Sequence, residues 1–375
     1  ASKLLFSSFS LCVLLAALYY GRNSRISLPF ELTESLQRCP TSSLSSSFAL
    51  SLLRQAFPSS ESFVLSPFSL GTALAIIHDG AGGNSQSELT KLFLEGCTAS
   101  DVTSHYSSLA RSLAKSGNAN VSFTSANRLY VADSIFLKED FIDHISNNYN
   151  VEADKINVNE KDESAKKINN FVEKETDGKM TNIINTQQIT DDLAAILVNA
   201  VYFEGAWEYQ FCESSTDSGI FHGVRGDIRL PFMALVEEEL LVNMENDFGT
   251  ALVLPYKGNE FKFFILMTKE TSEFEKMRND LTGEKINRIL YYARPTFARI
   301  YVPRIQIKSN LDGVEVLKRL GVHTVFSDEA DLSKLTDNSR VVMSKIFHGA
   351  TIETNEMETK AAANFFSKLT SDPLT

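Results

Sequence analysis

Side chains that could act as nucleophiles, general bases or metal ligands are scattered through this sequence. There is no His-Glu-x-x-His pair, Gly-x-Ser-x-Gly elbow or dinucleotide fingerprint. Gly80-Ala-Gly-Gly-Asn-Ser85 comes nearest to a phosphate loop, but it lacks the lysine and follows a predicted helix, so we interpret it as a helix terminator. The histidines do not stand at metal-ligand spacing from one another. They are His78, His105, His144, His222, His323 and His348.

These patterns do not indicate an enzyme, and we expect no catalytic site, no metal site and no cofactor. A triad assembled from distant residues stays open. The four cysteines form no Cys-x-x-Cys pair, and we interpret them as buried or isolated thiols rather than a disulfide framework. They are Cys12, Cys39, Cys97 and Cys212.

The composition is that of a large globular protein. The chain has 375 residues, of which 43% are hydrophobic and 22% are charged. Its net charge of −11 argues against a nucleic-acid partner, which would require clustered lysine and arginine.

An apolar run, Leu11–Tyr20, follows Lys3 and precedes two arginines. The run is short for a membrane span and has the length of a signal-peptide core. We therefore predict a leader at residues 1–30, a single domain at residues 31–375, and a secreted mature protein without a membrane anchor. A buried N-terminal helix and a cytoplasmic protein are the alternatives. Asn120-Val-Ser122 is the glycosylation sequon, which matters if the chain is secreted.

Hydrophobic periodicity predicts an α+β fold with helices early and strands late. Pro67 suits the first turn of a helix, and Gly178 suits a helix end that needs a left-handed residue. The predicted helices are 48–57, 67–77, 101–114, 141–149, 162–176 and 314–320, and the predicted strands include 63–66, 121–131, 193–203, 250–254, 261–267, 298–307 and 341–352.

One segment, Glu353–Asn364, carries two conflicting patterns. Glu356 and Lys360 stand at i,i+4 near three alanines, which favours a helix. Read by alternation, Thr359, Ala361 and Ala363 share one face of a strand with small side chains. A segment of this kind could change conformation.

Several segments together resemble the serpin family, the serine protease inhibitors of the loop-insertion type. The match runs from about Phe48 to the end of the chain, in family order. Glu204 stands where the family signature has lysine. The segments are Ser66-Pro-Phe-Ser-Leu70, Ile168–Lys179, Asn199-Ala-Val-Tyr-Phe-Glu-Gly-Ala-Trp207, Val302-Pro-Arg-Ile305, Leu317–Gly321, Phe326–Asp331 and Ser344–Ala350.

The resemblance implies a serpin fold with a large mixed sheet, smaller sheets and a reactive loop at residues 353–375. A protease attacks the exposed loop and forms an acyl-enzyme. The N-terminal part of the loop then inserts into the sheet as a new strand and carries the protease away before deacylation. Small inward side chains would let the segment enter the sheet.

The resemblance also implies site residues. The hinge would comprise Glu356, Glu358, Thr359, Ala361, Ala362 and Ala363. A hydrogen-bonded cluster beneath the opening sheet would comprise Ser66, Ser69, Asn199 and His348, with Trp207 at the end of the sheet where insertion begins.

Two hinge positions depart from the family pattern. Glu358 replaces a glycine at the flexing point, where a charged side chain would slow insertion. Phe365 would face inward, where small hydroxylated residues are typical, and overpacking costs about 1–3 kcal/mol.

Loop length places the reactive bond at Asp372-Pro373. Because proline on the leaving side resists most proteases, a loop of different length, with Lys368, Leu374 or Thr375 as the specificity residue, is the alternative. The family continues for a few tens of residues past the loop, so the resemblance implies that its C-terminal strands are absent from this chain.

The expected function is inhibition of a serine, or alternatively a cysteine, protease as a suicide substrate. A non-inhibitory binding or chaperone-like serpin and a truncated inactive isoform are the alternatives. The expected partners are the target protease and, for a cleaved molecule, its own C-terminal fragment. A heparin-type activator is not expected, because residues 101–115 contain only Arg111 and Lys115 as basic residues.

Overall fold

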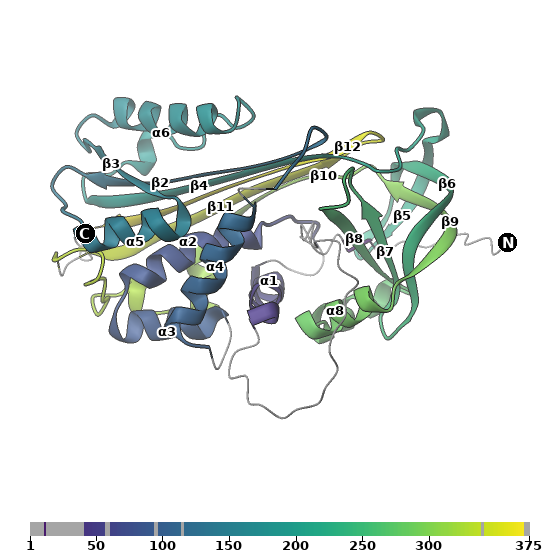
Figure 1. Cartoon of the computed structure of the whole chain (residues 1–375), viewed down its shortest axis with the longest axis horizontal. Helices are drawn as coiled ribbons and strands as arrows, with labels where there is room; N and C mark the ends of the chain where they lie inside the picture. Colours follow the sequence, from purple (N-terminus) through teal and green to yellow (C-terminus); the bar gives the residue numbers. More distant parts are fainter. Residues whose placement is uncertain are drawn as a thin grey trace.

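The structure is a computed structural model that describes residues 11–12, 41–56, 61–93, 97–113, 116–338 and 341–370. Two six-stranded sheets and a set of helices make up these residues. One sheet, here called the central sheet, runs along the length of the molecule, and the other, the second sheet, lies at one end (Figure 1). The predicted α+β class with a large mixed sheet is confirmed.

The central sheet has the strand order β10-β11-β12-β4-β2-β3. Its neighbours are antiparallel except for the parallel pair β2 and β3, which makes the sheet mixed. The strands are β2 (Val121–Ala132), β3 (Glu152–Ile156), β4 (Leu193–Ala206), β10 (Gln306–Asp312), β11 (Val342–Thr354) and β12 (Glu358–Thr370).

Strand β4 lies inside the central sheet because both of its faces are apolar. Residues 193–203 are all buried, as a continuous hydrophobic run predicts for a strand covered on two sides. Gly205 follows, where a Cβ atom would stand 2.6 Å from the Phe203 ring and 2.8 Å from the Tyr256 ring. Close aromatic packing therefore requires glycine at this position of the signature segment.

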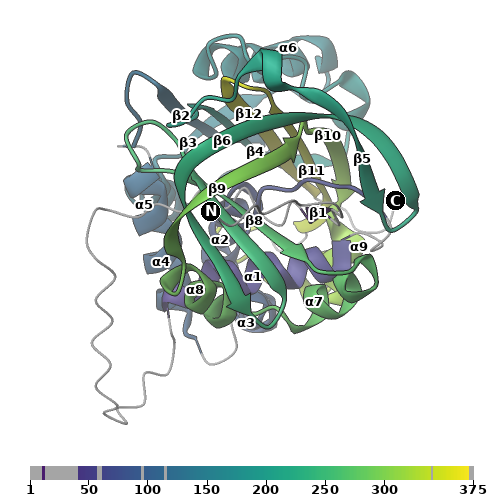
Figure 2. The same cartoon turned by 90° about the vertical axis from the view of Figure 1, so that its right-hand side faces the viewer.

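The second sheet has the order β1-β8-β7-β6-β5, and β9 also pairs with β6. In Figure 2 these strands lie in front of the central sheet. The strands are β1 (Leu11–Cys12), β5 (Asp217–Gly223), β6 (Gly226–Asn246), β7 (Gly249–Pro255), β8 (Lys262–Thr268) and β9 (Arg294–Pro303).

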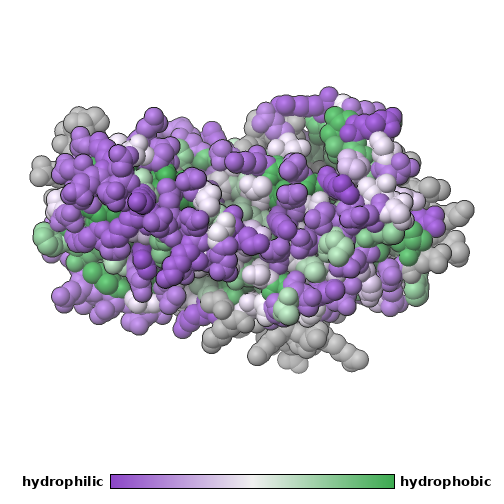
Figure 3. Space-filling view, turned by 90° about the horizontal axis from the view of Figure 1, so that it is seen from above, coloured by the Kyte–Doolittle hydropathy of each residue, from purple (hydrophilic) through white to green (hydrophobic). Residues whose placement is uncertain are grey.

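Helices cover both faces of the central sheet. Helix α6 lies over one face, and α2, α4 and α5 lie under the other (Figure 1). Seen from the side of α6, the surface is largely hydrophilic (Figure 3). The helices are α1 (Thr41–Ala56), α2 (Pro67–Gly80), α3 (Gly83–Phe93), α4 (Ala99–Leu113), α5 (Glu139–Tyr149), α6 (Lys161–Glu175), α7 (Phe274–Asp280), α8 (Gly283–Tyr291) and α9 (Gly313–Arg319), with short 3-10 turns at Thr186–Gln188, Glu213–Ser215, Thr271–Glu273 and Thr324–Phe326.

The helix signals in the sequence act as predicted. Ser66 caps α2 by accepting the Ser69 N–H, and Pro67 occupies the first turn. After α6, Gly178 has a φ of 74°, the left-handed conformation predicted for it.

Two strand predictions are wrong. Residues 63–66 are not a strand; their backbone donates instead to side chains of the central sheet, as from the Val64 N–H to Ser309 Oγ at 3.0 Å. Residues 298–307 belong to two strands in different sheets, β9 and β10, which are separated at Arg304 and Ile305. The chain passes from the second sheet to the central sheet at Arg304 and Ile305. One apolar run of the sequence therefore contributes a strand to each sheet.

Candidate functional site

A tight turn links β11 to β12 at one end of the central sheet. Asn355 closes the turn, because its Oδ1 accepts the backbone N–H groups of Met357 and Glu358, each at 2.9 Å. The Asn355 N–H donates to the Glu358 carbonyl at 3.0 Å. Asparagine is typical of such turns, since its short side chain reaches nearby backbone groups. Of the residues predicted as a hinge, Glu356 lies in this turn, and the others lie in β12: Glu358, Thr359, Ala361, Ala362 and Ala363.

Glu356 is a buried acid in this turn, with a side chain only 2% exposed. Its Oε1 accepts Arg304 Nη2 at 2.7 Å, Arg304 Nε at 3.0 Å and the Thr216 hydroxyl at 2.5 Å. Burial raises the pKa of Glu356, but the hydrogen bonds from Thr216 and Arg304 outweigh it and hold the pKa below its ordinary value. The carboxylate therefore ties the turn to the junction between β9 and β10.

Trp207, just beyond β4, holds the same turn from the other side. Its backbone N–H donates to the Met357 carbonyl at 3.0 Å, and its indole Nε1 donates to the Asn355 carbonyl at 2.9 Å. The indole stacks on Tyr256 with ring centroids 4.8 Å apart. These contacts place Trp207 at the end of the sheet where β12 begins.

Strand β12 fills the space between β11 and β4 over its whole length. It pairs antiparallel with both, so that Ala361, for example, lies between Ile352 and Phe203. Thr359 is fully buried, and Ala361 packs in the hydrophobic cluster shared with the second sheet. Ala362 faces the opposite way, into the cluster under α6. Small side chains thus let the strand fit between layers that are already covered on both sides.

The far end of β12 buries a lysine. Lys368 is 4% exposed, and its Nζ donates to Thr190 Oγ1 and lies 3.4 Å from Asp192 Oδ1. Burial lowers the pKa of Lys368, and Asp192 opposes this shift. Thr190 and Asp192, which precede β4, therefore bind the Lys368 ammonium at this end of β12; we call them the Lys368 receptor.

The four predicted cluster residues lie together beneath the central strands. Ser69 Oγ donates to Asn199 Oδ1, and the Ser66 N–H donates to His348 Nε2 at 2.9 Å. Ser66 Oγ accepts the Ser69 N–H at 3.3 Å, which joins the two pairs. The sequence reasoning missed Asn127, whose Oδ1 accepts Asn199 Nδ2. Asn127 stands directly opposite Asn199 in the β2–β4 register, a relation that only the strand pairing reveals.

Strand β12 passes between the two halves of this cluster. In the register of the sheet, the backbone of Phe365 lies between Asn199 on β4 and His348 on β11. The direction in which the Phe365 side chain was predicted to point falls outside the described residues. Asn199 and His348 therefore stand on strands that β12 separates.

The serpin family model (serine protease inhibitor) matches residues 43–373. The chain is a serpin. The described residues combine the turn at Asn355, strand β12 between β11 and β4, and the polar cluster below.

Two relatives show the extent of the similarity. Serpin B5 from Xenopus laevis is 30% identical over 80% of this chain and 80% of its own length. Alpha-1-antiproteinase 2 from Equus caballus is 29% identical over 84% of this chain and 75% of its own length.

Solved serpin structures share the fold. Cleaved kallistatin complexed with heparin has a TM-score of 0.78 and 25% identity, covering 89% of this serpin and 99% of that chain. Thyroxine-binding globulin complexed with thyroxine-fluorescein has a TM-score of 0.79 and 22% identity, covering 88% of this serpin and 98% of that chain.

Other predicted residues of the serpin lie apart or outside the described ranges. Asn120 is exposed in the turn before β2. The reactive bond at Asp372 and Pro373, like the leader at residues 1–30 apart from Leu11 and Cys12, lies outside the described residues. Within the described ranges, no three His, Cys, Asp or Glu side chains are placed to hold a metal ion. None of the helices described is long and apolar enough to cross a membrane.

The expectation of isolated thiols is wrong for one cysteine. Cys97 is disulfide-bonded, whereas Cys212 is a free and exposed thiol. Sequence spacing could not reveal this bond, because disulfide pairing depends on which segments the fold brings together.

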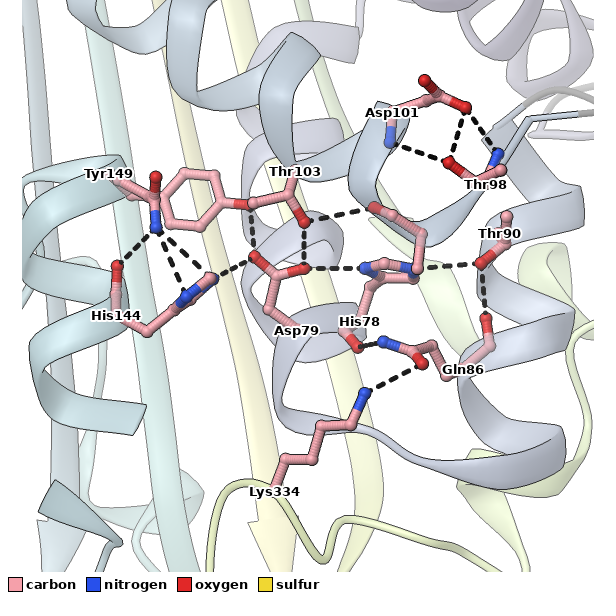
Figure 4. A network of polar contacts seen from close by, with 12 residues as sticks. His78, Asp79, Gln86, Thr90, Thr98, Asp101, Thr103, His144, Tyr149 and Lys334 are labelled. Atoms are coloured by element: carbon pink, nitrogen blue, oxygen red, sulfur yellow. Dashed lines mark hydrogen bonds and ion pairs between the residues drawn. The ribbon is translucent and has the colours of Figure 1, made fainter. Parts of the chain in front are cut away.

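Sequence reasoning also missed a buried acid, Asp79, between three helices of the serpin (Figure 4). Its Oδ1 accepts His78 Nδ1 at 2.9 Å and Thr103 Oγ1 at 2.6 Å, and its Oδ2 bonds to His144 Nε2 and the Tyr149 hydroxyl, both at 2.7 Å. Burial raises the pKa of Asp79, but these four bonds hold it far below its ordinary value. The sequence offered one signal for this network, because the polar pair His78-Asp79 ends an otherwise apolar helix. The network joins α2 to α4 and α5.

We expect His348 to make the serpin sensitive to acid. Burial lowers the pKa of His348 from 6.5 to about 4, so the unfolded chain binds more protons between these values. Stability should therefore fall as the pH drops through this window, by about 3 kcal/mol at 1.36 kcal/mol per pKa unit. The free energy of unfolding is measured with urea for wild type and His348→Gln at pH 7, 6, 5 and 4. As the pH falls from 7 to 4, the stability of the variant relative to wild type should rise by this amount.

The half-exposed His222, on the β5–β6 hairpin, offers the matched control His222→Gln. Parallel pH profiles for wild type and His348→Gln would contradict the role of His348.

Proposed function

We propose that this serpin inhibits serine endopeptidases as a suicide substrate. The observation that carries the proposal is β12, whose thirteen residues lie inserted between β11 and β4 directly after the hinge turn. The relative named alpha-1-antiproteinase 2 supports the same reading. The protein is then not an enzyme, since it supplies the bond that the protease attacks.

The mechanism follows from the strand pairing. The protease serine attacks a carbonyl in the loop beyond β12, and the chain on the leaving side departs with a proton. The acyl-enzyme is then held at the end of a free segment, which can enter the sheet and form hydrogen bonds with both β11 and β4. Insertion moves the acylated end to the far end of the central sheet, where the Lys368 receptor lies. Loop insertion in serpins is an established case of stored strain released by cleavage.

The bond attacked lies beyond β12 in this proposal. Lys368 is buried within the inserted strand, which favours a bond after it over Lys368 as the specificity residue. Asp372-Pro373 remains the predicted bond, with Leu374 and Thr375 as alternatives. An Asp at the specificity position would suit an Asp-selective protease, including a cysteine protease.

The test is direct. The serpin is incubated with a panel of serine and cysteine proteases, and the products are separated in SDS. A covalent complex that survives SDS with at least one protease is expected. Quantitative digestion of the loop by every protease, without such a complex, would contradict the proposal.

A non-inhibitory binding role is the second candidate. It is motivated by Glu358 and Phe365, two positions that depart from the family pattern. Such a protein, like an inactive truncated isoform, would be cut in its loop without a rise in melting temperature. A large rise would argue against this second candidate.

We propose that the serpin acts outside the cell, with a leader at 1–30 before a domain at 31–375; the cytoplasm is the alternative. The exposed sequon at Asn120 and the disulfide at Cys97 support an extracellular role. Heparin activation is not part of the proposal. Arg111 is the one basic residue among those described in α4, apart from histidine, and its guanidinium bonds to Ser107.

A further inference from the structure

Lys360 is the third residue of β12 and pairs with two acidic side chains. Its Nζ is 2.8 Å from Glu358 Oε1 and 3.3 Å from Glu204 Oε1. In the register of the sheet, Glu204 on β4 and Glu353 on β11 stand directly opposite Lys360 on its two sides. Two carboxylates therefore contact one ammonium, and the hydrogen bonds from Lys360 to Glu358 first and Glu204 next raise the pKa of Lys360.

The carboxylate of Glu204 is already positioned by groups outside the loop. Its Oε2 accepts the Tyr202 hydroxyl at 3.1 Å and Lys179 Nζ at 3.3 Å. Tyr202 belongs to β4, and Lys179 belongs to the segment after α6. The other oxygen, Oε1, faces Lys360. The partners of Glu204 Oε2 therefore lie outside β12, and Lys360 of β12 occupies the other carboxylate oxygen.

Two of the three departures from the serpin pattern, Glu204 and Glu358, belong to this one group of charges. A lysine at position 204, as in the family signature, would face Lys360 directly and repel it. The glutamate at 358, where glycine is usual, would add an unpaired charge at the hinge without Lys360. Each departure is thus matched by the same ammonium, which the sequence alone did not show.

We propose that Lys360 is the positioning residue that starts loop insertion in this serpin. Because it lies next to the hinge turn, its contact with Glu204 forms with the first residues that enter the sheet. Lys360 thereby raises the fraction of protease encounters in which insertion precedes release of the cleaved loop. This inference rests on the proposed inhibitory function.

The test is a double-mutant cycle with Lys360→Met, Glu204→Gln and the double variant. Each change removes a charge and keeps the side-chain length. Two quantities are measured: the melting temperature of the loop-cleaved protein, and the ratio of SDS-stable complex to cleaved serpin with a target protease. We expect each single variant to lower the ratio about two- to fivefold, as for a partly exposed pair, and the double variant to add little further.

Rescue and salt dependence distinguish positioning by charge from a loss of packing. Lys360→Arg should keep the wild-type ratio, and salt at about 1 M should shrink the difference between wild type and Lys360→Met. Lys308→Met, at an exposed lysine on β10 of the same sheet, is the matched control and should leave both quantities unchanged.

Additive effects of Lys360→Met and Glu204→Gln, or effects that persist at high salt, would overturn the inference. The melting temperature of the cleaved protein separates this outcome from failure of the proposed function. One outcome is that the two variants are non-additive in this melting temperature while no protease gives an SDS-stable complex. That result would establish the charge pair between Lys360 and Glu204 but would contradict both inhibition and the role of Lys360 in partitioning. Complexes without coupling would contradict the role of Lys360 alone.

Discussion

Under the proposed inhibitory function, replacing Thr359 with arginine should turn the serpin from an inhibitor into a substrate. Thr359 is fully buried in β12, so insertion of the Thr359→Arg strand would place an unpaired guanidinium in the core. Burying such a charge costs several kcal/mol. We expect the yield of SDS-stable complex to fall more than about tenfold, since about 1.4 kcal/mol corresponds to a factor of ten. Cleaved serpin should accumulate instead.

The matched control is Met357→Arg, which introduces the same charge two residues earlier. Met357 is 48% exposed in the hinge turn, so the arginine of this variant stays in water. Under the proposed mechanism the loop enters the sheet only after cleavage, so the melting temperature before cleavage should be alike for both variants. Normal complex formation by Thr359→Arg would show that β12 does not insert during inhibition.

Reversing the charge of Glu356 should destabilise the hinge strongly. Glu356→Lys would face Arg304 with a like charge in a buried site and would leave the Thr216 hydroxyl without its acceptor. Because Arg304 is 44% exposed and solvent screens it, the expected cost is about 1–3 kcal/mol, mainly from the buried partners left unpaired. Urea unfolding at neutral pH should show a loss of this size.

Two further variants sharpen this test. Glu208→Lys makes the same charge change at an exposed position next to Trp207, and it should alter stability by less than about 0.5 kcal/mol. The exchange Glu356→Arg with Arg304→Glu should recover part of the loss, because it restores opposite charges. A loss in Glu356→Lys no greater than in Glu208→Lys would contradict the anchoring role.

Local sequence was sufficient for the elements whose own residues determine their form. The continuous apolar run of β4 requires cover on both faces, and Ser66 with Pro67 starts α2 wherever the helix lies. Such signals act within a few residues, so a single chain reveals them. The order of the signature segments identified the serpin family for the same reason.

The candidate site was predictable only in part. Glu356, Trp207 and the polar cluster were named through the family resemblance, and the structure brings them to the hinge turn and the sheet beneath it. Asn127 and Asp79 were missed, because their partners come from other strands and helices. The acid Glu358, interpreted from the sequence as an obstacle to insertion, is paired with Lys360.

By itself, the sequence determined that residues 353–364 could be helix or strand, and that their small side chains would fit a sheet. Tertiary structure decided between the two, because the neighbouring edges of β11 and β4 supply hydrogen-bond partners along all of β12. Tertiary structure also determined which charged side chains pair. Lys360 and Glu204 are distant in the sequence and meet only because β12 and β4 are adjacent. Local propensity is too weak to choose a conformation that long-range pairing and burial determine.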